Sequence, residues 1–181
     1  GGVFPYPFID PGSVYDANLW DWDSFWTVCA LMACRERDET LAEHARGGVL
    51  NFLSFQAEDG YVPMMVNRSK EHGAYLLERH REGKILNMHK PFLCQQALVI
   101  SRYTGSFDWI APHAEQLERY FACYDRHYLH QRTGLYVWAD DVMIGMDNDP
   151  AVFGRPRFST ASVFLNGFMV AEMKAMAKLS R

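Results

Sequence analysis

The feature that most constrains the fold of this chain is an alternation between two kinds of helical segment. Apolar residues recur at helical spacing in five stretches, at about 24–37, 40–56, 92–105, 109–127 and 159–180. The first, third and fifth are rich in apolar residues, and the fifth is apolar around much of its circumference, which is typical of a helix surrounded by other helices. The second and fourth keep one charged face, as outer helices do. The sequence therefore predicts an all-α protein in which inner and outer helices alternate.

The links between these segments also alternate, between short and long. The links from an inner to an outer segment, 36–39 and 104–108, are short, whereas the links back, about 57–90 and 128–158, are long. Long loops within compact domains are usually functional or disordered. Because each long link enters the N-terminal end of an inner segment, all of them are expected to gather on one face. This pattern predicts a toroid of helical hairpins with a loop-lined cleft on that face.

Local signals mark some element boundaries. Thr40-Leu41-Ala42-Glu43 fits a capping box at the start of the second helix. Gly47 and Gly48, inside that helix, cost roughly 1 kcal/mol each relative to Ala, which predicts close backbone packing or a break. Strand signals are weak, and only 61–66 and 135–137 qualify, as short pieces inside loops.

Composition excludes several classes of function. Of 181 residues, 49% are hydrophobic and 22% charged, with a net charge of −4, which describes an ordinary globular protein. Lys and Arg are scattered, so no nucleic-acid partner is expected, and no apolar run is long enough to predict a membrane span. The four cysteines form no metal or redox spacing, which favours buried free thiols and a cytoplasmic location. The first residue is not Met, so the true N-terminus is expected to lie further upstream.

The most unusual loop is 138–150, Trp-Ala-Asp-Asp-Val-Met-Ile-Gly-Met-Asp-Asn-Asp-Pro. It places four carboxylates among a Trp and several apolar residues. A carboxylate held against apolar neighbours has its charged form disfavoured, so its pKa rises and it can stay protonated near neutral pH. A general acid needs this property. The alternatives are an acidic loop that binds a cation and one that caps a helix.

Other chemistries have weaker support. Asp147-Asn148-Asp149 is similar to the start of a calcium loop, but the Gly and terminal Glu of an EF-hand do not follow at the required spacing. The seven His show no close ligand pair on a helix, which disfavours zinc. The sequence contains neither a Gly-rich phosphate loop nor a nucleophile elbow. No metal and no cofactor are therefore expected.

Two further segments are predicted on the face of the long loops. Residues 15–24, Tyr-Asp-Ala-Asn-Leu-Trp-Asp-Trp-Asp-Ser, interleave Trp with Asp at the start of the first inner helix. Aromatic faces beside carboxylates suit a sugar, which has apolar ring faces and a rim of hydroxyls; the alternative is a helix-capping Asp above packed Trp side chains. Residues 87–96, Asn-Met-His-Lys-Pro-Phe-Leu-Cys-Gln-Gln, bring His89, Lys90 and Gln95 to the start of the next inner helix. A buried Gln there needs partners, from neighbouring loops or from a ligand.

Together these motifs resemble glycoside hydrolase family 63, in its bacterial α-glucosidase and mannosylglycerate-hydrolase branch, which is related to the trehalases. The ordered matches are 20–24 (Trp-Asp-Trp-Asp-Ser), 89–91 (His-Lys-Pro), 145–150 (Gly-Met-Asp-Asn-Asp-Pro) and 161–166 (Ala-Ser-Val-Phe-Leu-Asn). The resemblance implies an (α/α)6 barrel, of which residues 1–181 form about the first half of one catalytic domain. It also implies hydrolysis of α-glucosides or α-mannosides with inversion.

The resemblance carries residue roles with it. The family motif of Ser-Gly-x-Asp-Asn-Ser-Pro type has the general acid on the Asp before Asn, which falls on Asp147, although Ile144 and Asp149 stand where Ser is common. The Trp-Asp segment of the family contributes to the subsite for the released sugar. The residues expected to bind the glycoside or oligosaccharide substrate are Trp20, Asp23, His89, Gln95, Trp138 and Asn148.

The general base of this mechanism is not expected within these residues. An inverting glycosidase needs a second carboxylate roughly 6.5–9.5 Å from the first, and in this family it is a Glu in the C-terminal half of the barrel. Glu58, Glu71, Glu78 and Glu82 lie on the long second loop without the family's context, and Glu172 lies well inside the last helix. The chain is therefore expected to need the C-terminal half of its own barrel, to be close to inactive alone, and to expose apolar helix faces.

Two other functions stay open at this point. One is a different enzyme on the same architecture, such as a trehalase or a sugar epimerase that transfers protons through His or Tyr. The other is a non-catalytic carbohydrate-binding protein built on a helical toroid.

Overall fold

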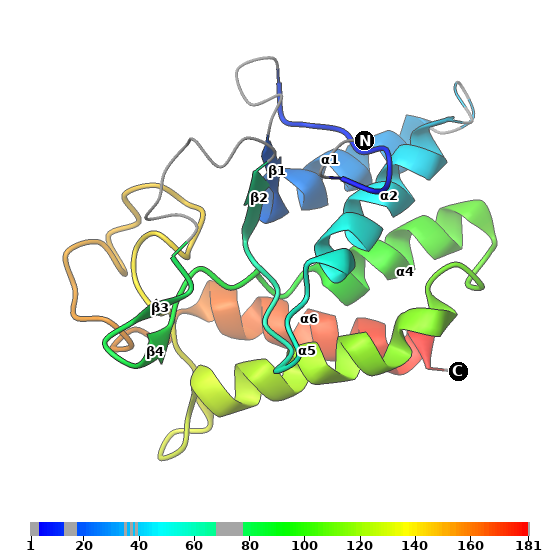
Figure 1. The fold of residues 1–181 in the computed structure, drawn as a ribbon. Coiled ribbons are helices and arrows are strands. Elements are labelled where there is room, and N and C mark those ends of the chain that lie inside the picture. The colour runs from blue at the N-terminus through cyan, green and yellow to red at the C-terminus, as the bar shows by residue number, and fades with distance from the viewer. Residues whose placement is uncertain are drawn as a thin grey trace.

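The computed structural model describes residues 4–12, 18–34, 36, 38, 40–67 and 78–180. Residues 15–17 of the Trp-Asp segment, the predicted helix end at Arg37, and Glu71 lie outside them. Helix dominates the described residues, so the mostly helical class is confirmed (Figure 1). The helices are α1 (Asp21–Cys34), α2 (Thr40–Ser54), α4 (Leu93–Thr104), the short 3-10 helix η3 (Ala111–His113), α5 (Ala114–His127) and α6 (Val163–Leu179).

Short antiparallel strand pairs fasten the long loops. They are β1 (Asn18–Trp20) with β2 (Met65–Asn67), β3 (His80–Arg81) with β4 (Lys84–Ile85), and β5 (Leu129–His130) with β6 (Leu135–Tyr136). The predicted strands at 61–66 and 135–137 overlap β2 and β6. The other four strands are too short to show a period-2 pattern of their own.

Helix boundaries follow local capping. α2 begins at Thr40 as predicted. The Thr40 hydroxyl, to which the capping box assigned the capping role, donates a hydrogen bond to the carboxylate of Asp38 (2.7 Å), and this carboxylate also accepts one from the Thr40 backbone N–H (2.9 Å). α4 ends at Thr104, and the following Gly105 has a φ of 69°, which suits the left-handed turn that often follows a helix. α6 begins at Val163 rather than near 159, because the Ser162 side chain accepts a hydrogen bond from the backbone N–H of Leu165.

The glycine pair in α2 separates into two roles. A Cβ atom on Gly47 would lie 1.7 Å from the carbonyl oxygen of Pro7, so the chain near Pro7 packs directly against this turn of the helix. A Cβ atom on Gly48 would have nothing within 4 Å. The predicted close packing is therefore present at Gly47, and α2 runs through both glycines without a break.

The three predicted inner helices lie next to one another, because α4 packs against α1 on one side and against α6 on the other. In Figure 1 the N-terminal ends of these helices face the long loops, and the link between α4 and α5 lies at the opposite end. Several large apolar side chains of α1 and α6 stay exposed. They are Trp26, Val163, Phe164, Val170 and Met173. Within the described residues, α1 and α6 are thus covered on one side only.

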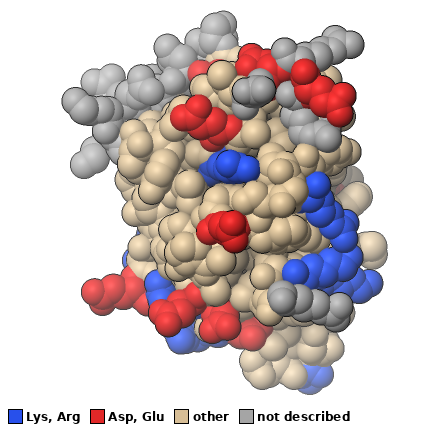
Figure 2. Space-filling model, turned by 90° about the vertical axis from the view of Figure 1, so that its right-hand side faces the viewer, with Lys and Arg blue, Asp and Glu red and all other residues tan. Residues whose placement is uncertain are grey.

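The cysteines, the candidate membrane spans and the surface charges can be compared with what the composition predicts. Cys94 and Cys123 are buried and Cys29 is partly buried, but Cys34 is exposed, so the expectation of buried thiols was wrong there. Across the described part of the chain, no helix is both long and apolar enough to span a membrane. On the face shown in Figure 2, Lys and Arg alternate with Asp and Glu in small groups among uncharged residues.

Candidate functional site

The N-terminal ends of α1 and α4 and the long loop before α6 enclose a cleft of about 790 Å³. Four predicted site residues line it: Trp20, Asp23, Asp147 and Asn148. They meet because β1 leads directly into α1 and the 138–150 loop passes over the same helix end. Trp22 and the exposed Phe153 line the cleft as well. Phe153 carried no sequence signal, because it stands outside every motif.

The loop that carries Asp147 divides its residues between core and cleft. Met143 and Ile144 are fully buried, whereas Asp147 and Asn148 are exposed. Asn148 has a φ of 59°, a left-handed conformation that Asn adopts more readily than most residues. The expectation of a carboxylate buried against apolar neighbours is therefore not met at Asp147, because the apolar residues point into the core.

Asp23 is the cleft carboxylate with a shifted pKa. Partial burial raises the pKa of Asp23 above its usual range, and the nearby carboxylates of Asp21 and Asp147 act in the same direction. A backbone hydrogen bond and the charge of Lys90 oppose these effects. The raised pKa is therefore found at Asp23, whereas the sequence predicted it in the 138–150 loop.

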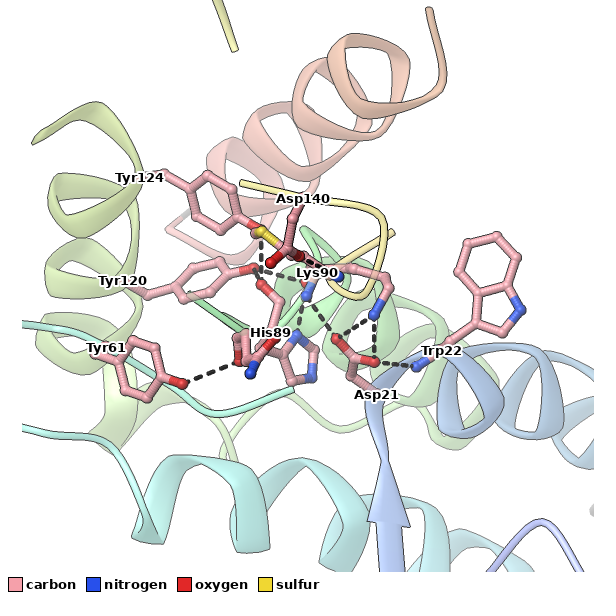
Figure 3. Close-up of polar contacts among 10 residues, drawn as sticks. Asp21, Trp22, Tyr61, His89, Lys90, Tyr120, Tyr124 and Asp140 are labelled. Atoms are coloured by element: carbon pink, nitrogen blue, oxygen red, sulfur yellow. Dashed lines mark hydrogen bonds and ion pairs between the residues drawn. The ribbon is translucent and has the colours of Figure 1, made fainter. Parts of the chain in front are cut away.

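A buried ion pair forms the floor of the cleft (Figure 3). The Lys90 ammonium lies 2.8 and 3.1 Å from the two carboxylate oxygens of Asp21. The backbone N–H of Lys90 donates to the same carboxylate at 2.7 Å, and that of Trp22 donates at 2.6 Å. The two side chains are 2% and 0% exposed. The sequence does not predict this pair, since no periodic pattern links residues so far apart.

His89 lies beneath this ion pair rather than in the wall of the cleft. Its ring packs edge-on against Phe52, and its Nδ1 lies 2.6 Å from the Lys90 carbonyl oxygen. The hydroxyls of Tyr120 and Tyr124 donate to the His89 carbonyl oxygen at 3.0 and 2.7 Å. Burial lowers the pKa of His89 to about 4, so the ring is neutral. His89 therefore supports the chain around Lys90.

Trp138 and Gln95 also lie outside the cleft wall. Trp138 is buried, donates its indole N–H to the Ser162 hydroxyl at 2.8 Å, and pairs as an isolated β-bridge with Thr160. The Gln95 side chain donates to the carbonyl oxygens of Pro91 (2.6 Å) and Phe168 (3.3 Å). Both side chains hold loops and helices together, and any contact with a ligand stays a prediction.

Glu172 is a second buried carboxyl, and no role is predicted for it from the sequence. It accepts hydrogen bonds from the backbone N–H groups of Cys94 (2.6 Å) and Gln95 (3.0 Å), in the first turn of α4. Burial raises the pKa of Glu172 to about 7, and these hydrogen bonds oppose the rise. Its burial could have been predicted from its position, because Glu172 falls at helical spacing in the buried stripe of α6, which is Leu165, Met169, Glu172 and Ala175.

A smaller hollow of about 380 Å³ adjoins the cleft, since Asp141 and Val142 line both. It brings Arg81, Arg155 and Arg157 near Asp140, whose carboxylate lies 3.5 Å from Arg157 Nε. Within the described ranges, no three His, Cys, Asp or Glu side chains come together in a way that could hold a metal ion.

Comparison with known proteins adds no relative to this description. No family model matches the chain, and neither curated proteins nor solved structures give a significant match. The function is therefore argued from the cleft and its residues.

Proposed function

We propose that this chain forms the acid-bearing half of an inverting α-glycoside hydrolase with an (α/α)6 barrel. The observation that carries the proposal is the meeting of Trp20, Trp22, Asp23, Asp147 and Asn148 around one cleft of about 790 Å³. This size falls within the range of roughly 300–1,000 Å³ that is usual for small-ligand sites. Indole faces beside carboxylates offer stacking and hydrogen-bond acceptors together, as a sugar ring requires.

In this proposal Asp147 protonates the departing glycosidic oxygen. Its exposure lets it reach a leaving group that enters from solvent, and Asn148 beside it can orient the sugar through its amide. Asp23, at the start of α1, forms a hydrogen bond with a sugar hydroxyl. Trp20 and Trp22 stack on the ring.

The attacking water is activated by a Glu from the C-terminal half of the same barrel. The packing of α4 against α1 and α6, with α2 against α1 and α4, supports the proposal, because a barrel of this type is built from neighbouring inner helices backed by outer ones. The exposed apolar residues of α1 and α6 are the surface on which further helices would pack.

The test uses the protein with its complete barrel and measures reducing sugar released from α-glucosides and α-mannosides. Asp147→Asn is expected to lower kcat by about 10²–10⁴, the usual contribution of a positioned acid. The matched control is Asp149→Asn, two residues away and outside the cleft wall. Proton NMR during the first turnovers is expected to show the β-anomer of the released sugar, as inversion requires.

Unchanged hydrolysis in Asp147→Asn would overturn this assignment. Sugar binding with no reducing sugar released at any pH would favour a carbohydrate-binding protein instead. A changed sugar without release of a reducing end would favour an epimerase.

A further inference from the structure

Three segments that are distant in the sequence meet at Lys90. Asp21 opens α1, Lys90 precedes α4, and Gly145 belongs to the loop that carries Asp147. All three line the floor or walls of the cleft. Lys90 lies where they converge, and Figure 3 shows its ammonium directed at the Asp21 carboxylate.

The loop lies directly on the Lys90 side chain. A Cβ atom on Gly145 would be 2.5 Å from Lys90 Cε, 3.1 Å from Lys90 Nζ and 3.4 Å from Trp22 Cβ. Gly145 also has a φ of 77°, which residues with a Cβ rarely adopt. Only glycine allows the backbone to come this close, so the height of the loop above α1 is set by the Lys90 stem.

Lys90 itself is fixed from below. Its carbonyl oxygen accepts a hydrogen bond from the Tyr120 hydroxyl at 2.7 Å and lies 2.6 Å from His89 Nδ1. Its backbone N–H is held by Asp21. With both peptide groups and the ammonium engaged, Lys90 cannot shift without breaking contacts to α1 and α5.

We propose that Lys90 is a positioning residue of the cleft: its buried ammonium, paired with Asp21 and covered by Gly145, fixes the Asp147 loop against the helix end that carries Asp23. The same charge lies close enough to favour the ionised form of Asp23. Lys90 thus sets the spacing between the carboxylates of Asp23 and Asp147 and places a positive charge close to Asp23. The positioning role is argued from these contacts alone, and only its consequence for catalysis rests on the proposed function.

Loss of stability alone does not test this role. Removing one member of a buried ion pair leaves the other charge unpaired, which is strongly destabilising whatever the pair does. Replacing both members by neutral groups of similar size is often tolerated. The informative variant is therefore Asp21→Asn/Lys90→Met, which keeps the volume beneath Gly145 and removes both charges.

Two readouts on the full chain report position rather than stability. The first is amide hydrogen exchange at Met143 and Asp149, whose N–H groups bond to Asp140 and to the Met146 carbonyl within the loop. The second is the pKa of Asp23, followed by carboxyl ¹³C NMR. The matched control is Lys174→Met on the exposed side of α6. The amide of Tyr128 at the end of α5 serves as a reference for global opening.

In the double variant, the loop amides are expected to exchange roughly tenfold faster while Tyr128 stays protected, because the loop opens locally. The pKa of Asp23 is expected to fall, because the double variant removes Asp21, which raises this pKa, together with Lys90, which lowers it by a smaller amount. Lys90→Arg keeps both charges and is expected to preserve the pKa while still loosening the loop, since the guanidinium is larger. Loop exchange and Asp23 titration equal to those of Lys174→Met would overturn the proposal. Both readouts are independent of turnover: a loosened loop in a protein without glycosidase activity would refute the proposed function and leave Lys90 as a positioning residue.

Discussion

The carboxylate of Glu172, on α6, lies 2.6 Å from the backbone nitrogen of Cys94, in the first turn of α4. The first N–H groups of a helix have no partner within the helix. Glu172 satisfies two of them from a neighbouring helix, through Cys94 and Gln95. The contact therefore joins the packing of α6 to the capping of α4.

Glu172→Gln is expected to lower the free energy of unfolding by about 1–3 kcal/mol, because an amide can present only one acceptor oxygen to the two N–H groups. Urea denaturation at pH 6 measures this difference. Glu118→Gln, on the exposed face of α5, is the matched control and is expected to change stability by less than about 0.5 kcal/mol. Equal stability of the two variants would show that Glu172 does not cap α4.

The pH dependence of stability has a defined sign at Glu172. Its pKa is raised to about 7 in the folded protein from an ordinary value of 4.5. The stability that this group contributes is therefore fully present below about pH 4.5 and is lost as the pH rises through about 7. The shift corresponds to about 3 kcal/mol. The difference in unfolding free energy between the wild type and Glu172→Gln should fall between pH 5 and pH 8, and a constant difference would contradict the raised pKa.

The stability that His89 contributes is expected to depend on pH in the opposite direction to that of Glu172. Its pKa is lowered to about 4 by burial, from an ordinary value of 6.5. The folded state is therefore favoured above pH 6.5, and the contribution of His89 is lost as the pH falls through about 4. Ring ¹³C and ¹H shifts of His89 should stay those of neutral imidazole down to about pH 5. A protonated ring at pH 6 would mean that His89 is not enclosed between Phe52 and the tyrosines.

The two glycines of α2 are expected to respond oppositely to alanine. Gly47→Ala places a methyl group against the Pro7 carbonyl and should lower the free energy of unfolding by roughly 1–3 kcal/mol. Gly48→Ala meets nothing within 4 Å and should raise it by about 0.5–1 kcal/mol, because alanine is the better helix former. Thermal or urea unfolding of the two variants side by side measures both changes. A stabilising Gly47→Ala would contradict the packing of the N-terminal segment on α2.

The tryptophans are expected to separate into sugar-binding and structural groups. Trp20→Ala should weaken binding of a glycoside to the cleft by about tenfold, through loss of ring stacking. Trp138→Phe should leave that affinity unchanged and lower stability, since it removes the hydrogen bond to Ser162. Titration calorimetry with methyl α-glucoside and methyl α-mannoside measures the affinities. Equal losses of affinity in both variants would contradict this separation and show that Trp138 contributes to sugar binding as much as Trp20 does.

The helices were predictable because apolar periodicity is a local property of the chain. Local signals also placed the end of α4 at Gly105 and the start of α2 at Thr40. The start of α1 was predicted near residue 24, whereas the helix begins at Asp21. The alternating Trp and Asp residues have no helical periodicity, and the contact between Asp21 and Lys90 cannot be seen in the sequence.

The cleft was predictable in part, for a geometric reason. Segments that enter neighbouring helices at the same end must meet, so Trp20 and Asp147 share a wall. The direction of each side chain was not predictable, because it depends on distant contacts. His89 turns toward Phe52, and Gln95 toward the carbonyl oxygens of Pro91 and Phe168. The Asp21–Lys90 pair joins residues 69 positions apart and left no trace in any local pattern.

The bridge between Trp138 and Thr160 closes the base of the longest described loop. The backbone N–H of Trp138 donates to the Thr160 carbonyl oxygen at 3.0 Å. Paired strand residues lie about 5 Å apart, so residues 139–159 leave and rejoin the body of the protein at nearly one point. Because Met143 and Ile144 within this segment are buried in the core, only its exposed residues can vary while α5 and α6 keep their places. Asp147 and Asn148 belong to this exposed part, so changes there would alter ligand preference without changing the helical scaffold.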